Sequence, residues 1–410
     1  MAVDLILTPP KRRAHAHAPI PYTGSPLLLC LADIRLFFSL AWSIPGILTP
    51  LTQWQGGELD ELYPSLPNLY CLTLHAFLIL FQSLFLLSLP LLIVLPVWVV
   101  AIYLAAVYTV TAYVAHLLNG TTDVLHSAID VSSAPPHPGE RWIYLNGVSV
   151  GRHWLQSNLD RLARTFRRPV TGVHNRTYGL LFDLVQCILE RDFLYATTDM
   201  RRSYAAVKAA LLEPATEKVV LILHSQGGIE GGIILDWLLT EGTSRLPRPS
   251  FCEGRGMCGV LTCNAVDRAC VAKCEIYTFG SAANHFNNPR CAPSAAAVRH
   301  IEHYASDAEF VACWGVLYFA KLPNRYAGNL FVRQGTGHLM NQHYLNALFP
   351  LGEDGRVMEE EGNWEAVSMA EGEAEVEGAV CGARRRRKGM KSVRDRSRLW
   401  AYRDGRAPEE

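Results

Sequence analysis

A long run without charged residues constrains this chain more than any other feature. From residue 62 to residue 122 there is no Asp, Glu, Lys or Arg, and residues 69–118 are almost continuously apolar. One membrane-spanning helix needs about 20 apolar residues, so the run is long enough for two. Pro90 and Pro96 mark a break between them. Helices of soluble proteins keep a polar face, which this run lacks. The sequence therefore predicts a transmembrane helical hairpin, about 69–89 and 92–117, rather than a buried pair of core helices.

The segment before the hairpin has a mixed character. The first 25 residues contain several Pro and His residues and the basic triplet Lys11-Arg12-Arg13. Residues 27–51 are apolar but carry Asp33 and Arg35 near their middle. Each charge at the centre of a bilayer costs a few kcal/mol, which disfavours a third span. We expect residues 1–61 to be a disordered leader with an interfacial helix, and a core helix is equally allowed.

Residues 141–350 alternate between short β-type runs and helical runs, after an expected linker at 123–140. This alternation predicts an α/β fold with a mostly parallel sheet and helices on both faces. The expected strands are 142–148, 170–174, 219–223, 275–279, 300–304 and 329–333. The expected helices are 154–166, 180–190, 203–212 and 227–240.

The end of the chain segregates its charges. Residues 353–377 hold ten acidic residues and one basic residue, and residues 384–398 hold nine basic residues. Such composition cannot form a core, so residues 351–410 are expected to be a disordered, solvated tail. The functional alternative is a basic arm that contacts anionic lipid head groups. Lys+Arg and Asp+Glu are both 38, so no general attraction to nucleic acid is expected.

The cysteines do not indicate a metal site. Five of them (Cys252, Cys258, Cys263, Cys270 and Cys274) share one stretch, but their spacing fits no zinc pattern. A variable loop with reduced thiols is one interpretation, and a disulfide-stapled loop in an oxidising compartment is the other. No metal or cofactor is expected.

The main chemical signal is an apolar strand that runs into a serine. Residues 219–223 are Val-Val-Leu-Ile-Leu, and His-Ser-Gln-Gly-Gly follows, with Ser225 at the turn before a helical pattern. This context is what a nucleophile elbow requires, because the sharp turn exposes the hydroxyl group. The helix N-terminus also favours a developing oxyanion. The usual glycine two residues before the serine is Leu223, which leaves open a degenerate elbow in an inactive protein.

A catalytic serine needs a base, and the base needs an orienting acid. In α/β-hydrolases the acid and then the histidine follow the serine, each after a strand. Asp307 and Glu309 follow one expected strand, and His338 and His343 follow the next. His338 lies next to a glycine on an expected turn, which suits a mobile imidazole better than His343 in an expected helix.

The oxyanion hole needs a second backbone amide besides the one after the serine. Asn146-Gly147 ends the first expected strand, where many hydrolases carry this loop. We therefore assign the hole to the amides of Val148 and Gln226. An ordinary turn accounts equally well for Asn146-Gly147.

Four motifs between residues 142 and 350 resemble the fungal class 3 lipases and related lipase-like serine hydrolases. They are Ser225 with its flanks, Tyr-Thr-Phe-Gly-Ser at 277–281, Glu-Phe-Val at 309–311 and Gly-His at 337–338. The resemblance implies an α/β-hydrolase fold. It also implies that the catalytic acid is Glu309 rather than Asp307, because the family's acid precedes an apolar residue and a valine. The family normally has aspartate at this position.

These features together predict a membrane-anchored hydrolase that cleaves a carboxylic ester, and the membrane anchor favours a lipid ester. The alternative is an inactive hydrolase fold that serves as a membrane-bound binding or scaffold module. The basic residues before the hairpin favour a cytosolic hydrolase domain. Two glycosylation sequons, at Asn119 and Asn175, favour the opposite side, although both are poor acceptors by their positions. Organelle and oligomeric state have no signal in the sequence.

Overall fold

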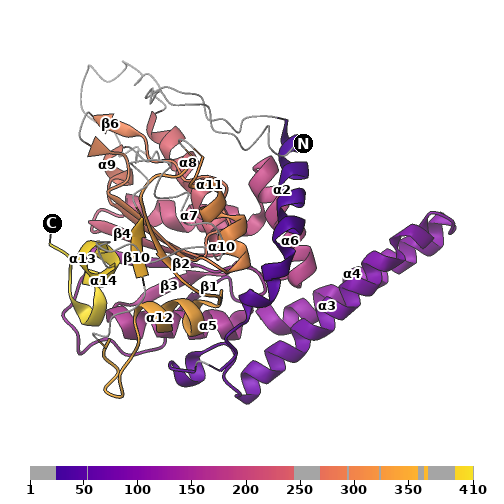
Figure 1. The fold of residues 1–410 in the computed structure, drawn as a ribbon, viewed down its shortest axis with the longest axis horizontal. Helices are drawn as coiled ribbons and strands as arrows, with labels where there is room; N and C mark the ends of the chain where they lie inside the picture. Colours follow the sequence, from indigo (N-terminus) through magenta and orange to yellow (C-terminus); the bar gives the residue numbers. More distant parts are fainter. Residues whose placement is uncertain are drawn as a thin grey trace, which may run out of the picture.

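The core of the protein is a twisted sheet of eight strands with helices on both faces. The computed structural model describes residues 25–52, 54–243, 268–292, 295–322, 325–358, 364–367 and 393–409. The strand order is β1-β3-β2-β4-β5-β8-β9-β10. The six inner strands of this order (β3, β2, β4, β5, β8 and β9) run parallel to one another. The edge strands β1 and β10 each pair antiparallel with their neighbour. The prediction of a mostly parallel α/β sheet is therefore confirmed (Figure 1).

The strand bounds follow the sequence order. They are β1 (Val124–His126), β2 (Glu140–Leu145), β3 (Val170–Val173), β4 (Lys218–His224), β5 (Cys274–Phe279), β8 (His300–Ser306), β9 (Asn329–Arg333) and β10 (Trp364–Val367). A separate two-stranded ribbon joins β6 (Arg290–Ala292) to β7 (Ala295–Ala296).

The central strand β4 shows why the apolar runs lack alternation. All of its residues are buried, and successive side chains point to opposite faces. Leu221 and Leu223 join the apolar cluster on one face, whereas Val220 and Ile222 join the cluster on the other. A parallel strand covered on both sides therefore reads as a continuous apolar run.

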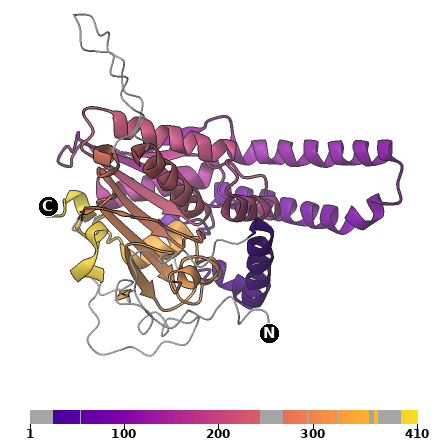
Figure 2. The same ribbon diagram turned by 90° about the horizontal axis from the view of Figure 1, so that it is seen from above.

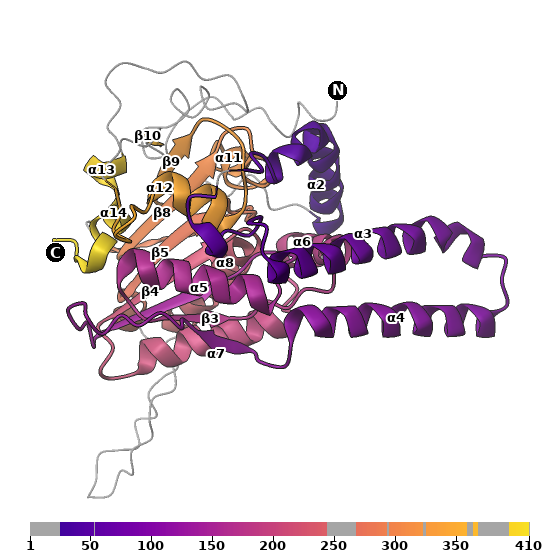
Figure 3. The same ribbon diagram turned by 90° about the horizontal axis from the view of Figure 1, so that it is seen from below.

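Helices cover the two faces unequally. Figure 3 shows α5 and α12 over one face, where α14 and the π-helical turn η3 also pack. These elements are α5 (Arg152–Phe166), η3 (Met340–Leu345), α12 (Asn346–Leu348) and α14 (Arg398–Ala401). The opposite face carries α6 (Leu180–Phe193), α7 (Thr198–Leu212), α8 (Gln226–Thr243), α9 (Arg268–Val271), α10 (Phe310–Trp314) and α11 (Val316–Phe319).

Two long antiparallel helices, α3 (Leu66–Leu92) and α4 (Val97–Asn119), project from the α/β domain (Figure 2). Their inner ends are docked: α3 buries residues only up to Gln82, and α4 only from Val107 onward. Between these two residues no side chain is buried. The charge-free run therefore combines a docked root with an exposed apolar tip. Both helices are long and apolar enough to cross a membrane.

A third apolar stretch, Pro26–Ile47, also meets this length and composition criterion. It comprises α2 (Pro26–Leu40) and the 3-10 helix η1 (Ala41–Ile47). Asp33 on α2 is fully buried and its Oδ2 atom lies 2.6 Å from Nε of Arg191 on α6. The Arg191 guanidinium in turn stacks 3.6 Å from the ring centre of Trp314. The charge in the middle of this apolar stretch is thus a docking contact with the α/β domain.

Several segments expected to lie outside the folded domain belong to it. The expected linker 123–140 contains β1, which pairs with β3. The expected disordered tail contributes β10, which pairs with β9, and the elements α13 (Val393–Arg396), α14 and η4 (Arg403–Gly405). The tail packs onto the domain because a few apolar side chains interrupt its charged sequence. Leu399, Trp400 and Tyr402 are all buried. The basic run 384–388 and the cysteines at 252–263 lie outside the described residues, as does the leader 1–24.

Candidate active site

Ser225 lies in a left-handed turn between β4 and α8. Its φ is 57°, which is uncommon for any residue other than glycine. The amide of Ser225 donates to the carbonyl oxygen of Phe279 at 3.0 Å, which fixes this turn against the end of β5. A strained backbone at a strand-to-helix turn is the local geometry of a nucleophile elbow.

Glycines of α8 allow the helix to approach the ends of the strands. A Cβ atom at Gly227 would lie 3.1 Å from the carbonyl oxygen of Asn146, and closer still to that of Leu145. A Cβ at Gly228 would lie 3.0 Å from Cβ of Ser281. The Gly-Gly pair after the serine is therefore required by close packing at the turn.

Leu223 stands where a nucleophile elbow usually has a glycine, two residues before the serine. A glycine on α8, at position 231, makes room for its side chain. Leu223 is fully buried. A Cβ atom added at Gly231 of α8 would lie 3.1 Å from Cδ2 of Leu223 and closer still to its Cδ1. The missing side chain at 231 thus provides the space that the leucine at 223 fills. The departure at this position is compatible with a close strand–helix contact.

Glu309 and His338 are in contact. Oε2 of Glu309 lies 3.2 Å from Nδ1 of His338, although the angles are not those of a hydrogen bond. Glu309 is fully buried and caps α10, where its carboxylate accepts from the amides of Val311 at 2.5 Å and Ala312 at 2.9 Å. These two amides hold the carboxylate in place beside the imidazole.

The imidazole of His338 lies close to the serine turn. The ring of His224, the residue just before Ser225, is centred 4.7 Å from the ring of His338. Nε2 of His224 donates to the carbonyl oxygen of His338 at 2.8 Å. A Cβ at Gly280, next to the carbonyl that Ser225 binds, would lie 2.8 Å from the His338 ring. Nε2 of His338 is buried and makes no hydrogen bond with a described residue.

The two alternative residues have other partners. Oδ1 of Asp307 accepts from the amide of Gly335 at 2.9 Å, which ties it to the turn after β9. His343 uses both ring nitrogens: Nδ1 accepts from the amide of Leu339 and Nε2 donates to the carbonyl oxygen of Pro50, each at 3.0 Å. Burial lowers the pKa of His343 to about 4, so this ring is neutral at physiological pH.

The amides of Val148 and Gln226 make no hydrogen bond within the described residues. Val148 follows Gly147, where an added Cβ would lie 3.1 Å from Oγ of Ser225. The loop is fixed from two sides. The side chain of Asn146 exchanges 2.9 Å hydrogen bonds with the backbone of Asn175, and the amide of Ser149 donates to Asp183 on α6. Two unpaired amides therefore flank the serine.

The N-terminal segment holds the loop that carries His338. This contact was not predicted from the sequence. The amides of Gly337 and His338 donate to the carbonyl oxygens of Gly46 at 2.7 Å and Ile47 at 2.9 Å. The buried carboxylate of Glu61 accepts from the amides of Asn341 and Gln342, at 2.9 Å and 3.0 Å. Backbone pairing leaves no side-chain signal in the sequence, so only the acidic residue at 61 could have indicated this contact.

Helix α6 covers the turn through a chain of hydrogen bonds. Nε2 of Gln226 donates to Glu190 at 2.9 Å, and Nε2 of Gln186 donates to the other oxygen of Glu190 at 2.8 Å. Burial raises the pKa of Glu190, and burial together with the charge of Glu190 raises the pKa of Glu230 on α8 well above its usual value. The serine turn thus lies against carboxyl and amide groups that are buried away from water.

Comparisons of the chain with protein-family models, with curated proteins and with solved structures gave no match. The geometry of the site is therefore what supports a function.

Proposed function

We propose that this chain is a membrane-attached serine hydrolase of the α/β-hydrolase type that cleaves a carboxylic ester. The observation that carries the proposal is the left-handed Ser225 turn with the Glu309–His338 contact next to it. A lipid ester is the substrate class that fits a catalytic domain attached to an apolar hairpin.

In this proposal Oγ of Ser225 attacks the ester carbonyl carbon while Nε2 of His338 takes its proton. The amides of Val148 and Gln226 stabilise the oxyanion, and Glu309 stabilises the imidazolium. His338 returns the proton to the leaving alcohol, and water then hydrolyses the acyl-enzyme. Nε2 of His338 makes no hydrogen bond with Ser225 or with any other described residue, so this ring nitrogen is available to act as a base. The proposal requires its bond to Oγ of Ser225 to form when substrate binds.

The test uses the full-length protein in detergent micelles and a fluorophosphonate probe. Wild type is expected to be labelled and to hydrolyse p-nitrophenyl esters, and Ser225→Ala to do neither while unfolding at the same temperature. Ser133→Ala, on the exposed surface, is the matched control and should behave as wild type. Equal turnover by wild type and Ser225→Ala would show that the fold is not a serine hydrolase, as the scaffold alternative requires.

We also propose that the hairpin returns to its starting side and leaves the catalytic domain in the cytosol. Two contacts remove the argument that the glycosylation sequons made for the opposite side. Nδ2 of Asn119 donates to the carbonyl oxygen of Thr177 at 2.7 Å, and Asn175 is buried with its amide bound to Asn146. Neither sequon can carry a glycan in this fold.

A further inference from the structure

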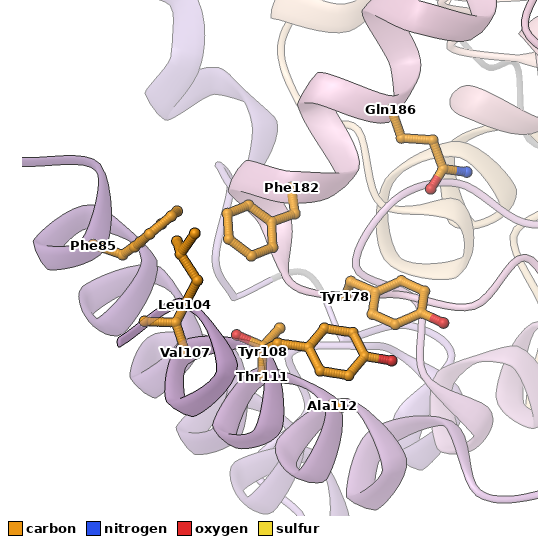
Figure 4. A pocket seen from close by; sticks show the side chains of 9 residues that line it. All are labelled: Phe85, Leu104, Val107, Tyr108, Thr111, Ala112, Tyr178, Phe182 and Gln186. Carbon is orange, nitrogen blue, oxygen red and sulfur yellow. The ribbon is translucent and has the colours of Figure 1, made fainter. Parts of the chain in front are cut away.

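An apolar pocket lies where the hairpin leaves the catalytic domain. It has a volume of about 320 Å³, within the range of ligand sites, and it lies between α4 and α6 (Figure 4). Phe85 and Leu104 line it on the side of the exposed hairpin tip, and Phe182 and Gln186 line it on the side of the domain. The Phe85 and Phe182 rings meet edge to face with centres 6.0 Å apart.

One polar group in this pocket lacks a partner. Thr111 on α4 is 3% exposed, and its Oγ1 atom makes no hydrogen bond with a described residue. Threonines in helices commonly donate to the carbonyl four residues earlier, as Thr109 does to Ala105 at 2.8 Å. A buried hydroxyl without a partner is costly, so it indicates a ligand atom that accepts a hydrogen bond.

The pocket is linked to the serine turn along one stripe of α6. Phe182, Gln186 and Glu190 are spaced four residues apart, so they lie on one side of the helix. Each is about 6 Å further along the helix axis than the one before it. Gln186 lines the pocket and donates to Glu190, which accepts from Gln226 next to Ser225. The other end of the pocket faces the apolar tip of the hairpin, where residues 83–106 bury no side chain. The pocket thus lies between the hydrocarbon-facing part of the chain and the candidate active site.

We propose that this pocket binds one acyl chain of a bilayer lipid, with a lipid oxygen accepting from Thr111 and the hydrocarbon leaving past Leu104 and Phe85. The identification of that lipid as the ester cleaved at Ser225 rests on the proposed function. The substrate class is then a long-chain acyl ester that reaches the site from the membrane rather than from water.

The first experiment compares hydrolysis of p-nitrophenyl palmitate and p-nitrophenyl acetate by full-length variants in micelles. Ala112→Trp fills the pocket, and Ala106→Trp places the same side chain on the exposed face of the same helix. Ala112→Trp should lower kcat/KM for the palmitate by at least about tenfold and leave the acetate unchanged. Ala106→Trp should change neither. Equal values for the two tryptophan variants on the palmitate would overturn the inference and leave the proposed function intact.

Thr111→Val distinguishes ligand binding from a folding defect. It keeps the shape but removes the unpartnered hydroxyl, so it should raise the melting temperature while it lowers palmitate turnover several-fold. An unchanged palmitate turnover would contradict the assigned hydrogen bond.

A second readout does not need activity. A diazirine analogue of palmitate, incorporated in phosphatidylcholine vesicles, should crosslink to the 104–112 region in Ser225→Ala, and the Ala112→Trp substitution in that background should abolish the crosslink. If wild type hydrolyses neither ester, the proposed function fails and the crosslink alone decides the pocket. Crosslinking that is unaffected by Ala112→Trp would reject the pocket.

Discussion

Leu223 and Gly231 are expected to be energetically coupled, because one side chain fills the space that the other lacks. Gly231→Ala would normally stabilise a helix by about 0.5–1 kcal/mol. Here the added methyl group meets the buried Leu223 side chain, and overpacking costs about 1–3 kcal/mol. We therefore expect a net destabilisation of about 1–2 kcal/mol. Leu223→Ala removes a fully buried side chain and should cost about 3–4 kcal/mol.

The double variant should be more stable than Leu223→Ala alone. Without the Leu223 side chain, the methyl group at position 231 has room. The alanine then stabilises the helix by its higher helix propensity, and its methyl group fills part of the cavity that the leucine leaves. We expect the double variant to be destabilised by about 2–3 kcal/mol, compared with about 5 kcal/mol for additive effects. The coupling of about 2 kcal/mol is measurable by urea unfolding of the full-length protein in dodecyl maltoside, followed by tryptophan fluorescence.

Gly232→Ala provides the matched control. A Cβ at Gly232 would approach the carbonyl oxygen of His285 and not Leu223, so its combination with Leu223→Ala should be additive. Effects of Leu223→Ala and Gly231→Ala that add to within about 0.5 kcal/mol would refute this coupling. In that case Leu223 is not accommodated by α8, and the departure from the usual elbow glycine has no structural compensation.

Three further predictions follow from the site and its surroundings. Glu309→Gln should lower kcat for ester hydrolysis by about 10³–10⁴-fold, and Asp307→Asn by less than about threefold; equal losses would contradict the assignment of the orienting acid. Burial and the charge of Asp33 raise the pKa of Asp192 to about 8 from its usual 3.8. Because the folded state then holds the proton more tightly, the free energy of unfolding should fall as pH rises from about 4 to about 8. Asp192→Asn should remove this fall and add about 1–3 kcal/mol at pH 8, measured by urea unfolding at several pH values; a wild-type stability that rises over this interval would refute it. In sealed microsomes, protease added outside should digest the α/β domain; a shielded domain would require an odd number of spans.

The inner sheet and the serine turn were predictable from local patterns. Buried parallel strands such as β4 are short apolar runs, and the turn at Ser225 combines such a run with glycines at 227 and 228. The glycines at 231 and 232 repeat this pair four residues later, on the same side of the helix. This spacing of glycines predicts that the helix packs closely against the strands.

Other parts of the fold depend on partners far away in the sequence. The role of Asp33 is set by Arg191, 158 residues later, and a charge in an apolar segment does not show whether it meets a partner or lipid. The edge strand β1 has only three residues and alternates in burial, so its local signal is weak. Trp400 and Tyr402 were hidden among the charges of the tail, although each is an anchor that packs against the sheet layer.

The backbone pairing of Gly46 and Ile47 with the His338 loop has a consequence for biosynthesis. The chain that positions the candidate base is made almost 300 residues before that base, and the whole hairpin is made between them. If the hairpin spans a membrane, both of its ends must lie on the same side for this pairing to form. The candidate site is completed only late in translation.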